Sequence, residues 1–177
     1  MKQKNTFGNF SFINEVFQRC YLNDKDTERY FKTLINSQND ADYSRYTFFL
    51  ISYLIENNNY DKAKKVTNNF DYLNSSVLIS QGKKWLEDKN LDHFQEIFSC
   101  TNSNDIVSEL FFLIANLYSS QNDYEKSNFY LNIANYLNPK FIFNLSLLAE
   151  NYYLNDDYSN TLKTLEVFDK KHEFYYW

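Results

Sequence analysis

The side chains most able to carry out chemistry in this sequence are two histidines and two cysteines. His93 and His172 occur in helix–turn segments where no carboxylate or thiol is arranged to form a nucleophile–base pair. Cys20 and Cys100 lie far apart in the sequence and have no companion at a metal-binding spacing. The sequence therefore predicts no catalytic residue, no metal site and no disulfide framework, and it leaves a reducing compartment open.

Acidic and glycine residues that could bind cations or phosphates have simpler explanations. Asp123 and the pair Asp156–Asp157 fall between helical segments, where a carboxylate caps the first turn of the next helix and suits its dipole. Gly8 and Gly82 cannot be assembled into either of the common phosphate-binding glycine motifs. We therefore expect no cofactor.

Charge and apolar runs limit the partners of the chain. The net charge of −5, from 23 acidic and 18 basic side chains, argues against a nucleic-acid partner. The longest apolar run, Leu110 to Ala115, is too short for membrane insertion. No apolar signal-peptide core follows Met1, so the expected location is cytoplasmic if Met1 is the true start, and periplasmic if an upstream signal is missing.

The elements that position these residues are predicted to be helices that repeat. Only 2 Gly and 1 Pro occur among 177 residues, too few for the tight turns of an all-β fold, so the chain is expected to be all-α. A shift of 34 residues along the sequence superimposes residues 111–135 on residues 145–169 with six identities. The identical pairs are Leu113 and Leu147, Ala115 and Ala149, Tyr118 and Tyr152, Asp123 and Asp157, Tyr124 and Tyr158, and Leu131 and Leu165.

Each repeat is predicted to be a helical hairpin. Phe111, Ala115 and Tyr118 lie on one face of a first helix, a polar break follows at 119–123, and apolar residues then recur at helical spacing. One hairpin cannot bury its apolar face alone, so neighbouring hairpins must stack.

This pattern resembles the tetratricopeptide repeat (TPR), whose unit has the same length as the shift found here. With Ser108 at its first position, Phe111, Ala115, Tyr118 and Pro139 match the family's large, small, aromatic and proline places. The resemblance implies one domain over 1–177, a right-handed superhelix (α-solenoid) of about five antiparallel helical hairpins. The expected units are degenerate at 8–43, 44–74 and 75–107, clear at 108–141 and 142–170, with 171–177 as the start of a further helix or a tail.

The same resemblance implies a non-enzymatic scaffold that binds a protein or peptide in a concave groove. Carried onto this chain, the groove positions include Phe112, Asn116, Phe143, Glu150 and Tyr153. Asn116 matches the family members that hold acidic chaperone tails, but Phe112 stands where they have Lys, so that function is disfavoured. Nine acids and three lysines between Asp105 and Asp169 favour a basic and apolar ligand instead.

Two further expectations depend on the end of the sequence. The run Phe174-Tyr175-Tyr176-Trp177 is apolar where repeat arrays usually carry a polar cap, which predicts self-association through the C-terminal end. It also keeps an alternative open, in which the repeats are the accessory part of a longer enzyme or envelope-biogenesis protein. Abundant Asn, Lys, Phe and Tyr, which AT-rich codons encode, favour a bacterial source.

Overall fold

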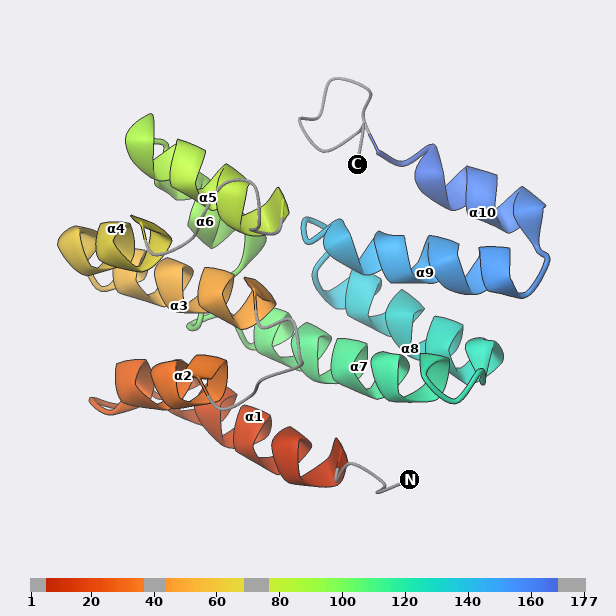
Figure 1. The fold of residues 1–177 in the computed structure, drawn as a ribbon, viewed down its shortest axis with the longest axis horizontal. Helices are drawn as coiled ribbons and strands as arrows, with labels where there is room; N and C mark the ends of the chain where they lie inside the picture. The colour runs from red at the N-terminus through yellow and green to blue at the C-terminus, as the bar shows by residue number, and fades with distance from the viewer. Residues whose placement is uncertain (1–5, 37–43, 69–76, 169–177) are drawn as a thin grey trace. The chain divides into compact units, whose positions relative to one another are not determined.

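The computed structural model describes residues 6–36, 44–68 and 77–168, which form ten helices and no strand (Figure 1). The expectation of an all-α chain is thus confirmed for these residues. The chain divides into two compact units, residues 1–103 and 104–177, called here the N-terminal and C-terminal units. His172, the tail at 171–177 and the unit boundaries expected at 43 and at 74–75 lie outside the described residues.

The ten helices follow one another in pairs along the chain, and each of the five expected ranges holds most of two helices. In the N-terminal unit α3 is central and contacts α2, α4, α5 and α6. The helices are α1 (Thr6–Tyr21), α2 (Thr27–Asn36), α3 (Ser44–Glu56), α4 (Tyr60–Asn68), α5 (Val77–Glu87), α6 (Asp92–Ile97), α7 (Ser103–Ser119), α8 (Tyr124–Leu137), α9 (Phe143–Leu154) and α10 (Tyr158–Leu165).

The same turn ends the first helix of every pair. In each turn one residue has left-handed backbone geometry, with φ between 49° and 60°. The next residue donates its N–H to the carbonyl oxygen five residues earlier, as Asp123 does to Tyr118 at 3.0 Å. This is the 6→1 hydrogen bond of a Schellman turn. The left-handed residues recur at nearly equal intervals along the chain and are Asn23, Asn58, Lys89, Asn122 and Asp156.

Asparagine and aspartate explain how a chain with so little glycine makes these turns. Four of the five left-handed residues are Asn or Asp, the residues other than glycine that tolerate this geometry best. In three turns a tyrosine two residues later donates its hydroxyl to the side-chain oxygen of the left-handed residue, at 2.8–3.0 Å. The donors are Tyr60, Tyr124 and Tyr158.

Aromatic rings fill the core of the N-terminal unit. Residues 46 to 55 of α3 are all buried, as expected of a helix surrounded by others. The ring of Phe49 stacks on Phe98 with centroids 4.0 Å apart and meets Phe17 edge-on at 5.8 Å. Glycine at position 82 leaves room for the ring of Phe94, because a Cβ there would lie only 3.3 Å from that ring.

A disulfide joins Cys20 to Cys100, whose Cα atoms are 5.2 Å apart, so the expectation of no disulfide is wrong. The fold brings the end of α1 beside the segment that follows α6. Glu56, at the end of α3, fixes that segment: its carboxylate accepts hydrogen bonds from the Ser99 hydroxyl at 2.6 Å and the Cys100 N–H at 3.2 Å. Spacing in sequence could not reveal a proximity that arises only when the hairpins pack.

Candidate functional site

The C-terminal unit contains all five predicted groove residues and is built on two close-packed hairpins. Ala115 on α7 and Ser127 and Ala134 on α8 are fully buried, and these small side chains let the two helices approach. The Ser108 hydroxyl donates to the Ala134 carbonyl at 2.8 Å. The first hairpin of the unit is therefore held by both packing and a buried hydrogen bond.

Leucines join α8 to the next hairpin. Leu131 of α8 belongs to the same buried cluster as Leu145 and Leu148 of α9. Half-buried apolar side chains pack around this cluster, namely Phe112, Tyr130, Ile142, Leu147, Tyr152 and Phe168.

A buried asparagine connects three helices of this unit and was not predicted. The Asn151 amide donates to the Ser127 hydroxyl at 2.7 Å and to the Asn128 side-chain oxygen at 2.8 Å, and its own oxygen accepts from the Ser119 hydroxyl at 2.7 Å. The network satisfies a fully buried polar side chain and links α7, α8 and α9. The sequence signal that could have found it is that Asn151 lies beside the apolar stripe of its helix, at the position where the preceding repeat has Leu117.

The structure places two of the predicted groove residues on α7. Phe112 is half-buried and packs against the leucine cluster, which gives it a structural role that the sequence register did not assign. Asn116, one turn later, is also half-buried and donates its amide to the Phe112 carbonyl at 2.9 Å.

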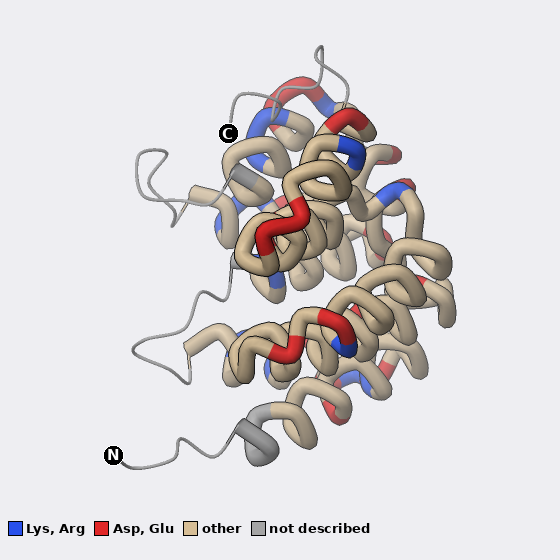
Figure 2. The backbone as a smooth tube through the Cα atoms, turned by 90° about the vertical axis from the view of Figure 1, so that its right-hand side faces the viewer, with Lys and Arg blue, Asp and Glu red and all other residues tan. Residues whose placement is uncertain are grey.

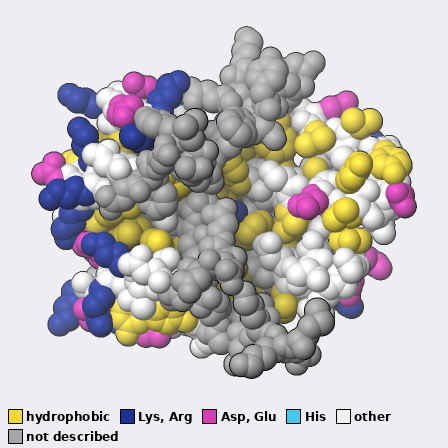
Figure 3. Space-filling model, in the orientation of Figure 1, with side chains coloured by type: hydrophobic (Ala, Val, Ile, Leu, Met, Phe, Trp, Pro, Cys, Tyr) yellow, Lys and Arg dark blue, Asp and Glu magenta, His cyan; other side chains and the backbone are white. Residues whose placement is uncertain are grey.

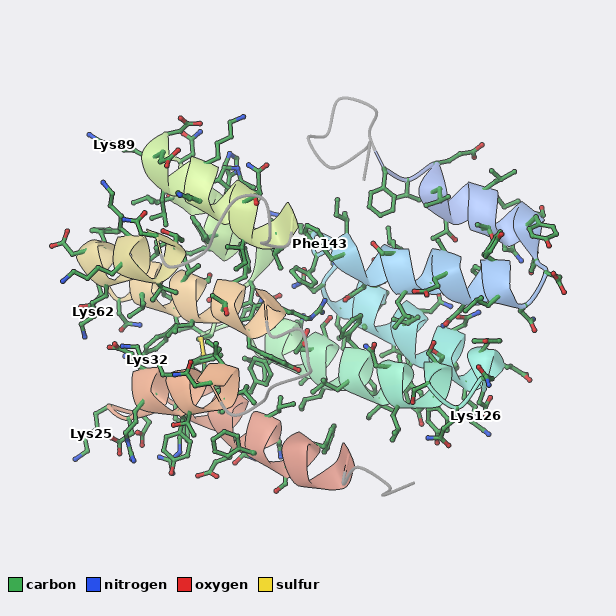
Figure 4. The ribbon with its side chains drawn as sticks, viewed as in Figure 1. Lys25, Lys32, Lys62, Lys89, Lys126 and Phe143 are labelled. Atoms are coloured by element: carbon green, nitrogen blue, oxygen red, sulfur yellow. A yellow bond between two sulfur atoms is a disulfide. The ribbon has the colours of Figure 1, made fainter. Side chains whose placement is uncertain are left out.

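The other three predicted groove residues lie on α9. Phe143 is half-buried near its N-terminal end, with its ring centroid 5.5 Å from that of Phe141. Glu150 is exposed, and Tyr153 is 59% exposed with its ring 5.8 Å from that of Tyr158. The surface offered by α9 therefore combines aromatic rings with one carboxylate. Phe143 is labelled in Figure 4.

Two of the three carboxylates predicted to cap helices in the C-terminal unit do so, whereas Asp156 is the left-handed residue of its turn. Asp123 and Asp157 accept hydrogen bonds from the N–H groups of Lys126 and Asn160 at the starts of α8 and α10. The Lys126 ammonium also bonds Asp123, which lowers the pKa of Asp123 and raises the pKa of Lys126. The bond from the Tyr158 hydroxyl to Asp156 raises the pKa of that phenol.

Charge differs between the two units. Residues 104–177 carry ten acidic side chains and five lysines, whereas residues 1–103 carry thirteen acidic and thirteen basic side chains. These positions can be followed along the backbone in Figure 2, where acidic residues are red and basic residues blue. The C-terminal unit is therefore the better surface for a basic ligand.

Basic side chains of the N-terminal unit gather over α2, α4 and α5 (Figure 3). Glu28 lies among them and accepts hydrogen bonds from Lys32 at 2.6 Å and Lys62 at 2.7 Å, which together lower the pKa of its carboxyl. Lys32 and Lys62 are labelled in Figure 4. An open depression beside α2 is lined by Lys25, Glu28, Arg29, Lys32, Thr33 and Asn36. Lys32, one of its cations, is thus already engaged by an internal carboxylate.

Within the described part of the chain, no group of three or more His, Cys, Asp or Glu side chains could hold a metal ion. His93 is exposed, with Nδ1 3.3 Å from a carboxylate oxygen of Glu96. Among the described helices, none combines the length and apolar character needed to cross a bilayer. Comparisons of the chain with family models, with curated proteins and with solved structures found no match.

Proposed function

We propose that this chain is a TPR-like interaction module, a solenoid of helical hairpins that binds a protein or peptide partner and carries out no catalysis. The observation that carries the proposal is the recurrence of one Schellman turn through both units, at intervals close to the repeat length of the TPR family. The matched small residues Ala115 and Ala149, both buried, support the same register. Repeat architectures of this kind bind partners along surfaces formed by successive hairpins.

The proposed binding surface is the face of α7 and α9 that carries Phe112, Asn116, Phe143, Glu150 and Tyr153. Tyr153 and Glu150 are exposed and so are accessible to a ligand. Since the surrounding unit is acidic, the ligand proposed is a basic and apolar segment.

Affinity capture with quantitative mass spectrometry tests this surface. Wild-type protein, a Phe112→Ala/Tyr153→Ala variant and a Glu150→Lys variant serve as baits, with Phe129→Ala as a matched control because Phe129 is an exposed aromatic residue on α8. We expect the partner to bind the wild type and the control, and to be lost from the other two baits.

The fold of each bait is checked by circular dichroism, because Phe112 also packs against the core. Glu150→Lys changes only an exposed side chain, so it remains informative if the double variant unfolds. A partner that binds all four baits equally would show that the groove is assigned wrongly.

We also propose that the protein works in an oxidising compartment, which favours the periplasmic alternative. The Cys20–Cys100 disulfide supports this location, because such bonds persist in exported proteins and are rare in the reducing cytosol. Alkylation of unreduced protein from its native source, followed by mass measurement, tests it. Two alkylated cysteines would contradict the proposal.

A further inference from the structure

We propose that the outer face of α10 docks a basic amphipathic helix of a partner protein, which packs there as α9 packs on α8. The face consists of Tyr158, Leu162 and Leu165, at helical positions i, i+4 and i+7, and all three side chains are exposed. Figure 3 shows hydrophobic side chains gathered over α9 and α10. The face meets the groove where the rings of Tyr158 and Tyr153 lie 5.8 Å apart, so the test substitutes Leu162 and Leu165, which are not groove residues, and either surface can fail its test while the other stands.

In the preceding hairpin the corresponding face of α8 is buried by the next helix. Leu131 of α8 is 1% exposed within the leucine cluster shared with α9, whereas Leu165, its counterpart in the next repeat, is 44% exposed. Ser127 is fully buried, whereas its counterpart Thr161 is only half-buried. The two helices differ because α9 covers α8, while no helix among the described residues covers α10 in this way. The α8–α9 interface is therefore an internal template for the missing contact.

The α8–α9 interface also indicates which residues the docked helix should carry. Leu145 and Leu148 of α9 pack with Leu131 of α8, and Asn151, one turn after Leu148, also reaches α8. Asn151 is polar there because it bonds the side chains of Ser127 and Asn128. The counterpart of Asn128 on α10 is Leu162, which cannot accept that hydrogen bond. The docked helix should therefore keep the Leu-x-x-Leu spacing and carry an apolar residue in place of the asparagine.

Charge decides between a second copy of this chain and a basic partner. The described residues of the C-terminal unit carry eight acids against three lysines, and exposed Asp156 and Glu166 flank the two ends of the face. A second copy would bring the same negative charge against it, whereas a helix with Lys or Arg beside its apolar stripe would be attracted. The occupant is therefore a cationic helix from another protein.

A labelled peptide and fluorescence anisotropy test the proposal on the full chain. The peptide has the sequence of residues 141–156 with Asn151→Leu on its packing face and Ser146→Lys, Glu150→Lys and Tyr153→Lys on its outer face. We expect it to bind, and expect Leu162→Asp or Leu165→Asp in the protein to weaken it roughly tenfold or more, because a buried leucine is lost from the contact. Leu154→Asp is the matched control, an exposed leucine on α9, and should change the affinity less than about twofold.

Four results would overturn the proposal. The peptide does not bind; or Leu154→Asp weakens it as much as Leu162→Asp, which means that the peptide does not bind specifically at the face of α10; or Glu150→Gln weakens it equally, which puts the peptide in the groove. The fourth is sedimentation equilibrium that shows a dimer of the protein alone, lost in Leu162→Asp, because a second copy then occupies the face. Circular dichroism verifies that each variant is folded.

Discussion

The two units share one hairpin turn but stabilise their hairpins in different ways. The N-terminal unit has a core of stacked aromatic rings, such as Phe49 on Phe98, and a disulfide between its first and last segments. The C-terminal unit has a smaller core of alanine, serine and leucine, with the Asn151 network in place of a covalent link. The hairpin backbone thus tolerates very different contacts between its helices.

The difference explains why the repeat is recognisable in only one unit. Close helix approach in the C-terminal unit requires small residues such as Ala115, so the pattern survives in the sequence. In the N-terminal unit Ile51 takes the equivalent place and large rings fill the space around α3. The turn residues persist in both units because left-handed backbone geometry restricts residue choice however the helices pack.

The largest expected effect concerns the covalent link. Replacing both cysteines, Cys20→Ala with Cys100→Ala, should destabilise the N-terminal unit by about 2–5 kcal/mol, because the bond closes a long loop in the unfolded chain. Hydrogen exchange read by mass spectrometry should show lost protection in peptides from residues 10–103 and little change in those from 104–168. Equal loss in both units would show that the disulfide does not stabilise the N-terminal unit in particular.

Overpacking is the corresponding test of the C-terminal unit. Ala115→Trp should cost about 2–4 kcal/mol, because it forces a large ring between helices that meet at a fully buried alanine. Val107→Trp, at an exposed position of the same helix, is the control and should leave the melting temperature nearly unchanged. An unaltered melting temperature for Ala115→Trp would argue against the repeat register.

Loss of the buried Asn151 amide should have a smaller effect on stability. Asn151→Leu removes the partner of Ser127 and Asn128, and leaving such groups unsatisfied costs about 1–3 kcal/mol. Urea unfolding measures this, with exposed Asn132→Leu on α8 as the control. If Asn151→Leu proves as stable as the wild type, packing alone holds the three helices together.

The smallest effect is a gain in stability at a turn. Lys89 is the only left-handed residue among the five turns that is neither Asn nor Asp, so Lys89→Gly should raise the free energy of unfolding by about 0.5–1 kcal/mol. Asn122→Gly should gain less, since asparagine already tolerates this geometry. Thermal melts of both variants, compared with the wild type, measure the difference. A larger gain at Asn122 would contradict the explanation given for the turns.

Part of the candidate site followed from local pattern, and part did not. The helical spacing of Phe111, Ala115 and Tyr118 predicted a helix there, and Ala115 proved fully buried within α7. The caps at Asp123 and Asp157 were also predicted correctly, because capping depends on neighbours in sequence. The packing of Phe112 against the core was not foreseen, since its burial depends on residues of other helices.

The sequence by itself determined the helical class, the turns and the repeat interval, because these depend on spacing and backbone preference within a few residues. Only the tertiary structure decided which distant groups meet. It joined Cys20 to Cys100, surrounded Asn151 with hydroxyl and amide partners, and left Leu165 exposed where its counterpart Leu131 is buried. Such contacts depend on how successive hairpins stack, and no local spacing in the chain records that.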